Sequence, residues 1–148
     1  MPVWYFAYGS NLDQDAMKRR IKYWHDLKPA ILRGFKLVFD HYSSSWGGGV
    51  ADVVESEGDI VYGGAYLLDE SQLQTLDRYE GVPHIYNRRK VRVEVEGREV
   101  EAFVYVVSNP RKHIAPSPEY LSRIIRGLKK LGYGDEVIEK VRRAAAGG

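Results

Sequence analysis

Apolar residues run without interruption from Val3 to Tyr8, and glycine and polar residues follow at once. An unbroken apolar run of this length indicates a strand that is buried on both faces. Gly9-Ser10-Asn11 then ends the strand, and the carboxylate of Asp13 can cap a short helix by accepting from its first backbone N–H groups. The start of the chain therefore predicts a strand, a tight turn and a helix.

Three further extended segments are predicted in the next part of the chain. Residues Ala30 to Tyr42 form one, and the serines and glycines from Ser43 to Gly49 indicate a loop after it. The other two, Val50–Val54 and Ile60–Leu67, flank Glu57-Gly58-Asp59. Because glycine readily takes the positive φ that tight turns often require, we expect a hairpin at this point.

A short helix and a second hairpin follow. Asp69 can cap a helix that carries two leucines three positions apart and ends near Glu80-Gly81. From Asn87 to Val95, valines alternate with charged residues, and Gly97 turns the chain into another strand from Val100 to Val107. This alternation is the clearest strand signal in the sequence.

The last part of the chain has a helical pattern. Pro116-Ser117-Pro118 opens one helix, which has leucine and isoleucine along one face and ends near Gly132. A second helix includes Val137 to Val141, and we expect Ala144 to Gly148 to be a frayed tail.

Strands joined by hairpins, with helices elsewhere in the chain, are typical of an α+β fold. We expect a small mixed, strongly bent β-sheet or barrel with peripheral helices, because such a sheet leaves the fewest unpaired edges. No repeat or linker divides the sequence, so residues 1–148 are predicted to form a single domain.

Composition and charge narrow the possible chemistry. The 148 residues carry a formal net charge of +2 from 22 basic and 20 acidic side chains, too even a balance for a typical nucleic-acid binder. The basic runs Lys18-Arg19-Arg20 and Arg88-Arg89-Lys90 are interpreted as solvated faces. Cysteine is absent, which excludes disulfides and thiolate catalysis, and the four histidines lack metal-ligand spacing. Without a secretory signal or a long apolar run, the expectation is a cytoplasmic protein with no metal, nucleic acid or membrane partner.

The turn after the first strand is a candidate anion site. A strand that leads through Gly9-Ser10-Asn11 into a helix presents several backbone N–H groups to one side, next to the positive end of the helix dipole. The alternative is that Gly9 only makes a turn and Asn11 only caps a helix. The sequence is neither a P-loop nor the elbow of a serine hydrolase, and Ser10 as a nucleophile would need a histidine base.

Glu80 is a candidate proton carrier. A glutamate at the end of a helix is usually solvated, and that interpretation remains open. Tyr79 and Tyr86 could raise the pKa of Glu80 if they exclude water from its carboxyl group. The eleven tyrosines are many for this length, and those in or near strands are expected to pack in the core and to form hydrogen bonds at its rim.

Five segments in a fixed order resemble one known family. They cover most of the chain: Tyr5 to Leu12, Gly47 to Ala51, Gly58 to Gly63, Leu76 to Val82, and Pro116 to Tyr120. Each is a weak signal alone, but together and in this order they resemble the γ-glutamylcyclotransferase family, which has the γ-glutamylcyclotransferase-like superfold.

The resemblance implies the site residues. Glu80 would be the general acid/base, and the substrate-binding residues would be Tyr8, Gly9, Ser10, Asn11, Leu12, Tyr86 and Tyr105. The segment from Pro116 to Tyr120 would close the site. The resemblance also implies a homodimer.

The implied reaction needs no cofactor. The α-amino group of a γ-glutamyl amino acid or peptide can attack its own γ-carbonyl carbon, giving 5-oxoproline and releasing the amine. One alternative keeps this site but changes the substrate to a γ-glutamylamine or to another acyl group. A second alternative is a non-catalytic module that binds a small acid at the turn.

Overall fold

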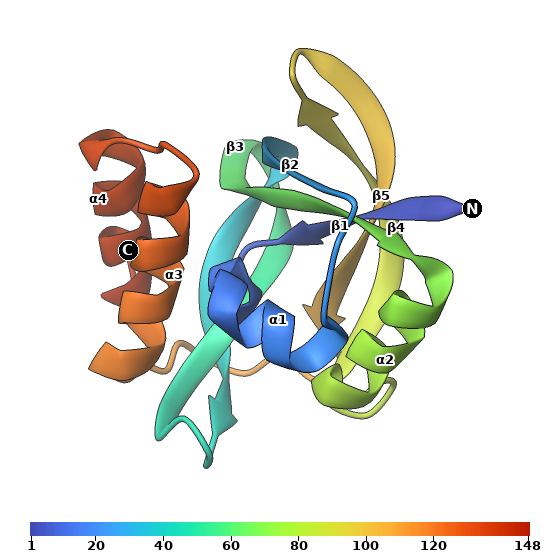
Figure 1. Ribbon diagram of the computed structural model, residues 1–148. Coiled ribbons are helices and arrows are strands. Elements are labelled where there is room, and N and C mark those ends of the chain that lie inside the picture. Colours follow the sequence, from blue (N-terminus) through green and yellow to red (C-terminus); the bar gives the residue numbers. More distant parts are fainter.

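The computed structural model describes residues 1–148. Five strands and four α-helices are present (Figure 1). In chain order the elements are β1 (Pro2–Ala7), the 3₁₀ turn η1 (Ser10–Leu12), α1 (Gln14–Ile21), β2 (Asp26–Ser43), β3 (Gly48–Asp69), α2 (Glu70–Glu80), β4 (Tyr86–Val95), β5 (Arg98–Val107), α3 (Pro118–Lys130) and α4 (Asp135–Ala145). No helix is long and apolar enough to cross a membrane.

The strands form a closed barrel in the order β1-β3-β2-β4-β5. The barrel closes through a parallel pairing of β1 with β5, in which Trp4 lies opposite Ala102, and the other neighbouring strands are antiparallel. Closure leaves few unpaired strand edges. The helices lie outside the barrel, with α3 and α4 side by side in Figure 1. The predicted α+β fold, a small mixed and strongly bent sheet or barrel with peripheral helices, is confirmed.

The hairpin predicted at Glu57-Gly58-Asp59 is wrong. Residues Gly48 to Asp69 form one continuous strand, β3, which pairs along its length with β2. The register shifts where Arg33 pairs with Ile60 but Phe35 pairs with Glu55, so the residues between Glu55 and Ile60 bulge from the ladder. Gly58 does have a positive φ of 84°, but the positive φ serves this bulge instead of a chain reversal.

Most other element predictions are confirmed. Gly97 turns β4 into β5, the Asp13 carboxylate accepts from the Asp15 N–H at the start of α1, and Ser117 caps α3. The tail is shorter than expected, because α4 continues to Ala145 and the Ala145 side chain is buried against the core.

Gly127 allows α3 to pack closely on the turn η1. A Cβ atom at position 127 would clash with the carbonyl oxygen of Leu12 and lie 2.6 Å from its Cβ. Alanine in a helix interior normally stabilises by about 1 kcal/mol relative to glycine. Here we expect Gly127→Ala to lower the free energy of unfolding by about 1 to 3 kcal/mol, measured by urea denaturation, because of the clash.

The matched control for this substitution is Gly134→Ala. Nothing lies within 4 Å of a Cβ at position 134, and its φ of −94° is open to alanine. This change should alter stability by less than about 1 kcal/mol, the size of a helix N-cap preference. A stabilising effect of Gly127→Ala would contradict the close packing of α3 on η1.

Candidate active site

The turn between β1 and α1 is held by its own backbone. The N–H groups of Leu12 and Asp13 donate to the carbonyl oxygens of Gly9 and Ser10, each at 3.0 Å. The N–H groups of Gly9, Ser10 and Asn11 take no part in these turn hydrogen bonds. Such a turn presents its remaining donors to one side, as an anion site requires.

Side chains from three other elements fix Asn11 within this turn. Its Nδ2 donates to the Tyr5 hydroxyl at 2.9 Å, and its carbonyl oxygen accepts from the Tyr66 hydroxyl at 2.8 Å. The guanidinium of Arg20, in the last turn of α1, donates to Asn11 Oδ1. Asn11 is therefore held on every polar atom of its side chain, so the turn is rigid before any ligand binds.

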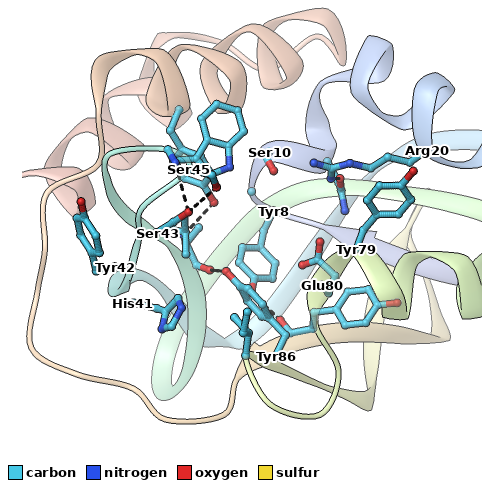
Figure 2. A pocket seen from close by; sticks show the side chains of 18 of the residues that line it. Tyr8, Ser10, Arg20, His41, Tyr42, Ser43, Ser45, Tyr79, Glu80 and Tyr86 are labelled. Atoms are coloured by element: carbon cyan, nitrogen blue, oxygen red, sulfur yellow. Dashed lines mark hydrogen bonds between the residues drawn. The ribbon is translucent and has the colours of Figure 1, made fainter.

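A pocket of about 370 Å³ opens beside the turn (Figure 2). This volume suits a small-molecule ligand. Its walls are formed by the turn, the end of α2, the start of β4, and the connection between β2 and β3. Its polar lining includes Tyr8, Ser10, Asn11, Arg20, Glu80 and Tyr86.

Glu80 is the only acidic side chain that lines the pocket. It is the last residue of α2, which Gly81 ends in the left-handed conformation, with φ at 67°. Figure 2 shows its carboxylate between Tyr8 and the pair formed by Arg20 and Tyr79. Burial raises the pKa of Glu80 to about 7, while the nearby charge of Arg20 partly opposes this rise. A carboxyl group with this pKa can both accept and donate a proton near neutral pH.

The tyrosines around Glu80 remain protonated. Burial raises the pKa values of Tyr8, Tyr86, Tyr105 and Tyr120 above the usual range, so each is a neutral phenol at physiological pH. The Tyr8 hydroxyl donates to the carbonyl oxygen of Tyr105 at 2.5 Å, and the Tyr105 hydroxyl donates to Asp77 Oδ1 at 2.7 Å. These bonds make a fixed aromatic wall beside the only lining carboxyl group.

Ala51 connects two of these tyrosines through its backbone. Its carbonyl oxygen accepts from the Tyr86 hydroxyl at 2.7 Å, and its N–H donates to the Tyr120 hydroxyl oxygen at 2.9 Å. The backbone N–H of Ser10 also faces the Tyr120 hydroxyl. The turn η1, the start of β3 and the start of α3 therefore meet at Tyr120.

Seven of the eight residues that the resemblance implies line this one pocket: Tyr8, Gly9, Ser10, Asn11, Glu80, Tyr86 and Tyr105. Leu12 does not line it. The Leu12 side chain is only 1% exposed in the core, and its N–H is used within the turn. The expected closing segment contributes Tyr120 to the lining, but not Pro116 to Glu119.

Ser10 has no histidine base beside it that could activate it as a nucleophile. His41 is the only histidine that lines the pocket, and Figure 2 shows it on the far side from Ser10. No hydrogen bond joins the two side chains. No group of three or more acidic or histidine side chains is placed to hold a metal ion.

Sequence reasoning missed several lining residues. Arg20 was assigned to a solvated basic run, yet its guanidinium reaches back to Asn11 and stacks on Tyr79, with 5.4 Å between the guanidinium carbon and the ring centre. Its position in the last turn of the helix that follows the turn was the signal that could have revealed it. Tyr5, His41 and Trp46 gave no such signal, because their place in the wall depends on barrel closure.

Two further carboxyl groups, on the side chains of Asp40 and Asp52, are buried next to residues of the pocket wall in the sequence. Asp40 and Asp52 are 5% and 2% exposed, and their side chains face each other closely enough to share a proton. Asp52 Oδ1 accepts from the N–H groups of Val53 and Val107, at 2.8 and 3.0 Å, whereas Asp40 Oδ1 has no partner. Burial and the neighbouring Asp52 raise the pKa of Asp40 to about 8. The pair ties β3 to β5 directly beside Ala51.

Several known proteins of similar sequence or structure are described as γ-glutamylcyclotransferases. The sequence model of a family described as "Gamma-glutamyl cyclotransferase, AIG2-like" matches residues 5–122. The γ-glutamylcyclotransferases of Mus musculus and Homo sapiens are 34% and 35% identical over 144 residues, and each match covers 93% of this chain and 76% of the relative. A solved structure of a γ-glutamyl cyclotransferase has a TM-score of 0.89 at 33% identity, covering 96% of this chain and 87% of that one. The chain therefore belongs to the γ-glutamyl cyclotransferase, AIG2-like family.

Proposed function

We propose that this protein is a γ-glutamylcyclotransferase, which converts a γ-glutamyl amino acid or peptide to 5-oxoproline and releases the amino acid or amine. The observation that carries the proposal is the placement of Glu80. It is the only acidic side chain that lines the pocket, its pKa is raised to about 7, and it lies across from a turn with free backbone donors. The family relationship supports the same assignment.

The turn would bind the substrate's α-carboxylate. The N–H groups of Gly9 and Asn11 are the available donors, and that of Ser10 would join them by exchanging the Tyr120 hydroxyl for the carboxylate. Charge-assisted hydrogen bonds to a carboxylate are stronger than neutral ones. Tyr8 ends the strand that leads into this turn. Tyr86 and Tyr105 form the wall, and their hydroxyl groups are already bound to Ala51 and Asp77, so their role is to shape the pocket. Leu12 supports the turn from the core without touching substrate.

Glu80 would carry the proton through the reaction. Its carboxylate accepts a proton from the α-ammonium group, and the freed amine attacks the γ-carbonyl carbon, forming the new C–N bond of a five-membered lactam. The carbonyl oxygen becomes an oxyanion, which backbone donors can stabilise. The bond from the γ-carbon to the departing nitrogen then breaks as the carbonyl re-forms, and Glu80 returns its proton to that nitrogen. The attacking nitrogen releases the one proton that a lactam does not keep, and the departing amine takes up a proton and leaves as an ammonium ion. No water, cofactor or metal takes part in this sequence.

The direct test is to incubate the purified protein with a panel of γ-glutamyl dipeptides and γ-glutamylamines and to detect 5-oxoproline by mass spectrometry. Formation of 5-oxoproline from the dipeptides supports the proposal. Turnover of the amines alone would favour a γ-glutamylamine cyclotransferase. Binding without any product would identify a non-catalytic module for small acids.

The pH dependence follows from the raised pKa of Glu80. The attacking amine needs the deprotonated carboxylate as its base, so kcat/KM should rise with pH through about 7 and then level off. Arg20→Gln removes the positive charge that favours the carboxylate form of Glu80, so the rise in kcat/KM should move to higher pH in this variant. Steady-state rates between about pH 5.5 and 8.5 measure both effects. A rise in kcat/KM centred near the ordinary glutamate pKa would contradict the assignment of Glu80 as base.

The proposal extends to the setting of the enzyme. Residues 1–148 would act as one domain in the cytoplasm, in keeping with a chain that has no cysteine. The partner is a small γ-glutamyl molecule, without nucleic acid or membrane, and the resemblance to the family makes a homodimer part of the same proposal.

A further inference from the structure

A second hollow, of about 250 Å³, adjoins the active-site pocket. It shares Ser10, Arg20, Trp46 and Tyr79 with that pocket, so these residues border both spaces. The remaining lining residues are Ala16, Arg19 and Arg123. We call this space the arginine hollow.

The arginine hollow is lined by three cations and by no acidic side chain. Arg123 is engaged by the carboxylates of Asp13 and Glu119, at 2.7 and 3.0 Å. Neither Arg19 nor Arg20 has a carboxylate oxygen within 4.0 Å. Two guanidinium groups without a close carboxylate partner therefore give the hollow a positive potential that favours an anionic ligand.

Two of the guanidinium groups are held by aromatic rings. Arg20 stacks on Tyr79 and Arg123 stacks on Trp46, with 5.4 and 5.5 Å between the guanidinium carbon and the ring centre. Stacking on a ring uses the face of the guanidinium, so the in-plane N–H groups of Arg20 that do not bind Asn11 remain able to bind a carboxylate. The wall of the hollow is thus partly ordered before a ligand arrives, which reduces the entropy lost on binding.

The proposed reaction directs one part of the substrate toward this hollow. Glu80 must come within hydrogen-bond distance of the departing nitrogen in order to protonate it. Arg20 lines the pocket together with Glu80 and also lines the arginine hollow, so in this pose the residue bonded to that nitrogen would lie next to Arg20. Its side chain can then extend past Ser10 and Tyr79 toward Arg19.

We propose that the arginine hollow is a subsite for a second carboxylate on the departing residue. This inference rests on the proposed function. It assigns Arg19 as a specificity-determining residue and predicts a preference for γ-glutamyl dipeptides whose departing residue has an acidic side chain. The subsite should therefore favour γ-glutamyl-glutamate over γ-glutamyl-glutamine, whose departing residue has the same shape but lacks the side-chain charge.

The experiment compares kcat/KM for these two dipeptides at low ionic strength. Wild type should favour γ-glutamyl-glutamate about fivefold, the size expected for one partly exposed charge pair. Arg19→Gln should bring the ratio close to one. Adding about 0.5 M NaCl should lower the wild-type ratio, because salt screens the attraction between the two charges. Lys18→Gln is the matched control, because Lys18 is exposed on the same helix and does not line the hollow, so its ratio should equal that of wild type.

Two results would overturn the subsite alone. One is turnover of both dipeptides at equal kcat/KM by wild type, and the other is an unchanged preference in Arg19→Gln. Failure of every γ-glutamyl dipeptide to give 5-oxoproline would instead overturn the proposed function, and the subsite with it.

Discussion

Glu80→Gln is expected to lower kcat for γ-glutamyl dipeptides by about 10²- to 10⁴-fold, the range that a positioned general acid/base contributes. The amide preserves the shape of the side chain, but it cannot accept a proton from the substrate's ammonium group or return one to the departing nitrogen. Substrate affinity should change little, because in the proposed binding mode the α-carboxylate is held by backbone donors of the turn and not by Glu80. Steady-state rates measure kcat, and calorimetric titration of the variant with a dipeptide measures the substrate affinity.

The matched control for Glu80→Gln is Glu70→Gln. Glu70 is exposed in the first turn of the same helix and does not line the pocket, so kcat should remain at the wild-type value. Comparable activity in Glu80→Gln and wild type would remove Glu80 from the mechanism. Equal loss in both variants would indicate damage to α2 instead of loss of a proton carrier.

Asp52→Ala is expected to lower the free energy of unfolding by about 3 kcal/mol, because it leaves two buried N–H groups without an acceptor. Those groups belong to Val53 and Val107, on β3 and β5. The substitution also removes the neighbour with which the buried Asp40 shares its proton. Urea denaturation at neutral pH measures the loss, and Glu57→Ala, at an exposed position of the same strand, should change stability by less than about 0.5 kcal/mol. A loss no larger than that of Glu57→Ala would contradict the structural role of the carboxyl pair.

The same pair makes stability depend on pH. The pKa of Asp40 is about 8 in the folded protein, against an ordinary value of 3.8, so between these values the folded chain holds a proton that the unfolded chain has released. Stability from this group is therefore fully present below about pH 4 and is lost as the pH rises toward 8. Asp40→Asn replaces the protonated carboxyl group by a neutral amide, so its urea midpoint should fall less than that of wild type between about pH 5 and 8.

The sequence predicts local structure well where local chemistry decides it. The run from Val3 to Tyr8, the cap at Asp13 and the alternating valines before Gly97 each correspond to the elements in the structure. Gly58 shows the limit of this reasoning. Its positive φ was foreseeable, but a hairpin and a bulge both use such a residue, and only the long pairing of β3 with β2 decides between them.

The site was predictable only as separate parts. The turn and Glu80 lie about seventy residues apart in the chain, and physical reasoning alone leaves Glu80 an ordinary helix-end acid. Barrel closure and the packing of α2 bring them to one pocket and bury the carboxyl group. Arg20, Asp40 and Asp52 were not foreseen, because their charges acquire a role only from side chains that lie far away in sequence.

Turnover of a γ-glutamyl dipeptide in water enriched in ¹⁸O tests the central claim most directly. In the proposed reaction the substrate's own nitrogen attacks the γ-carbonyl carbon, and water supplies no atom of the product. The 5-oxoproline should therefore contain no ¹⁸O, as read by mass spectrometry. Glutamate labelled with ¹⁸O in its side-chain carboxylate would show that the pocket hydrolyses its substrate, and would contradict the cyclisation mechanism.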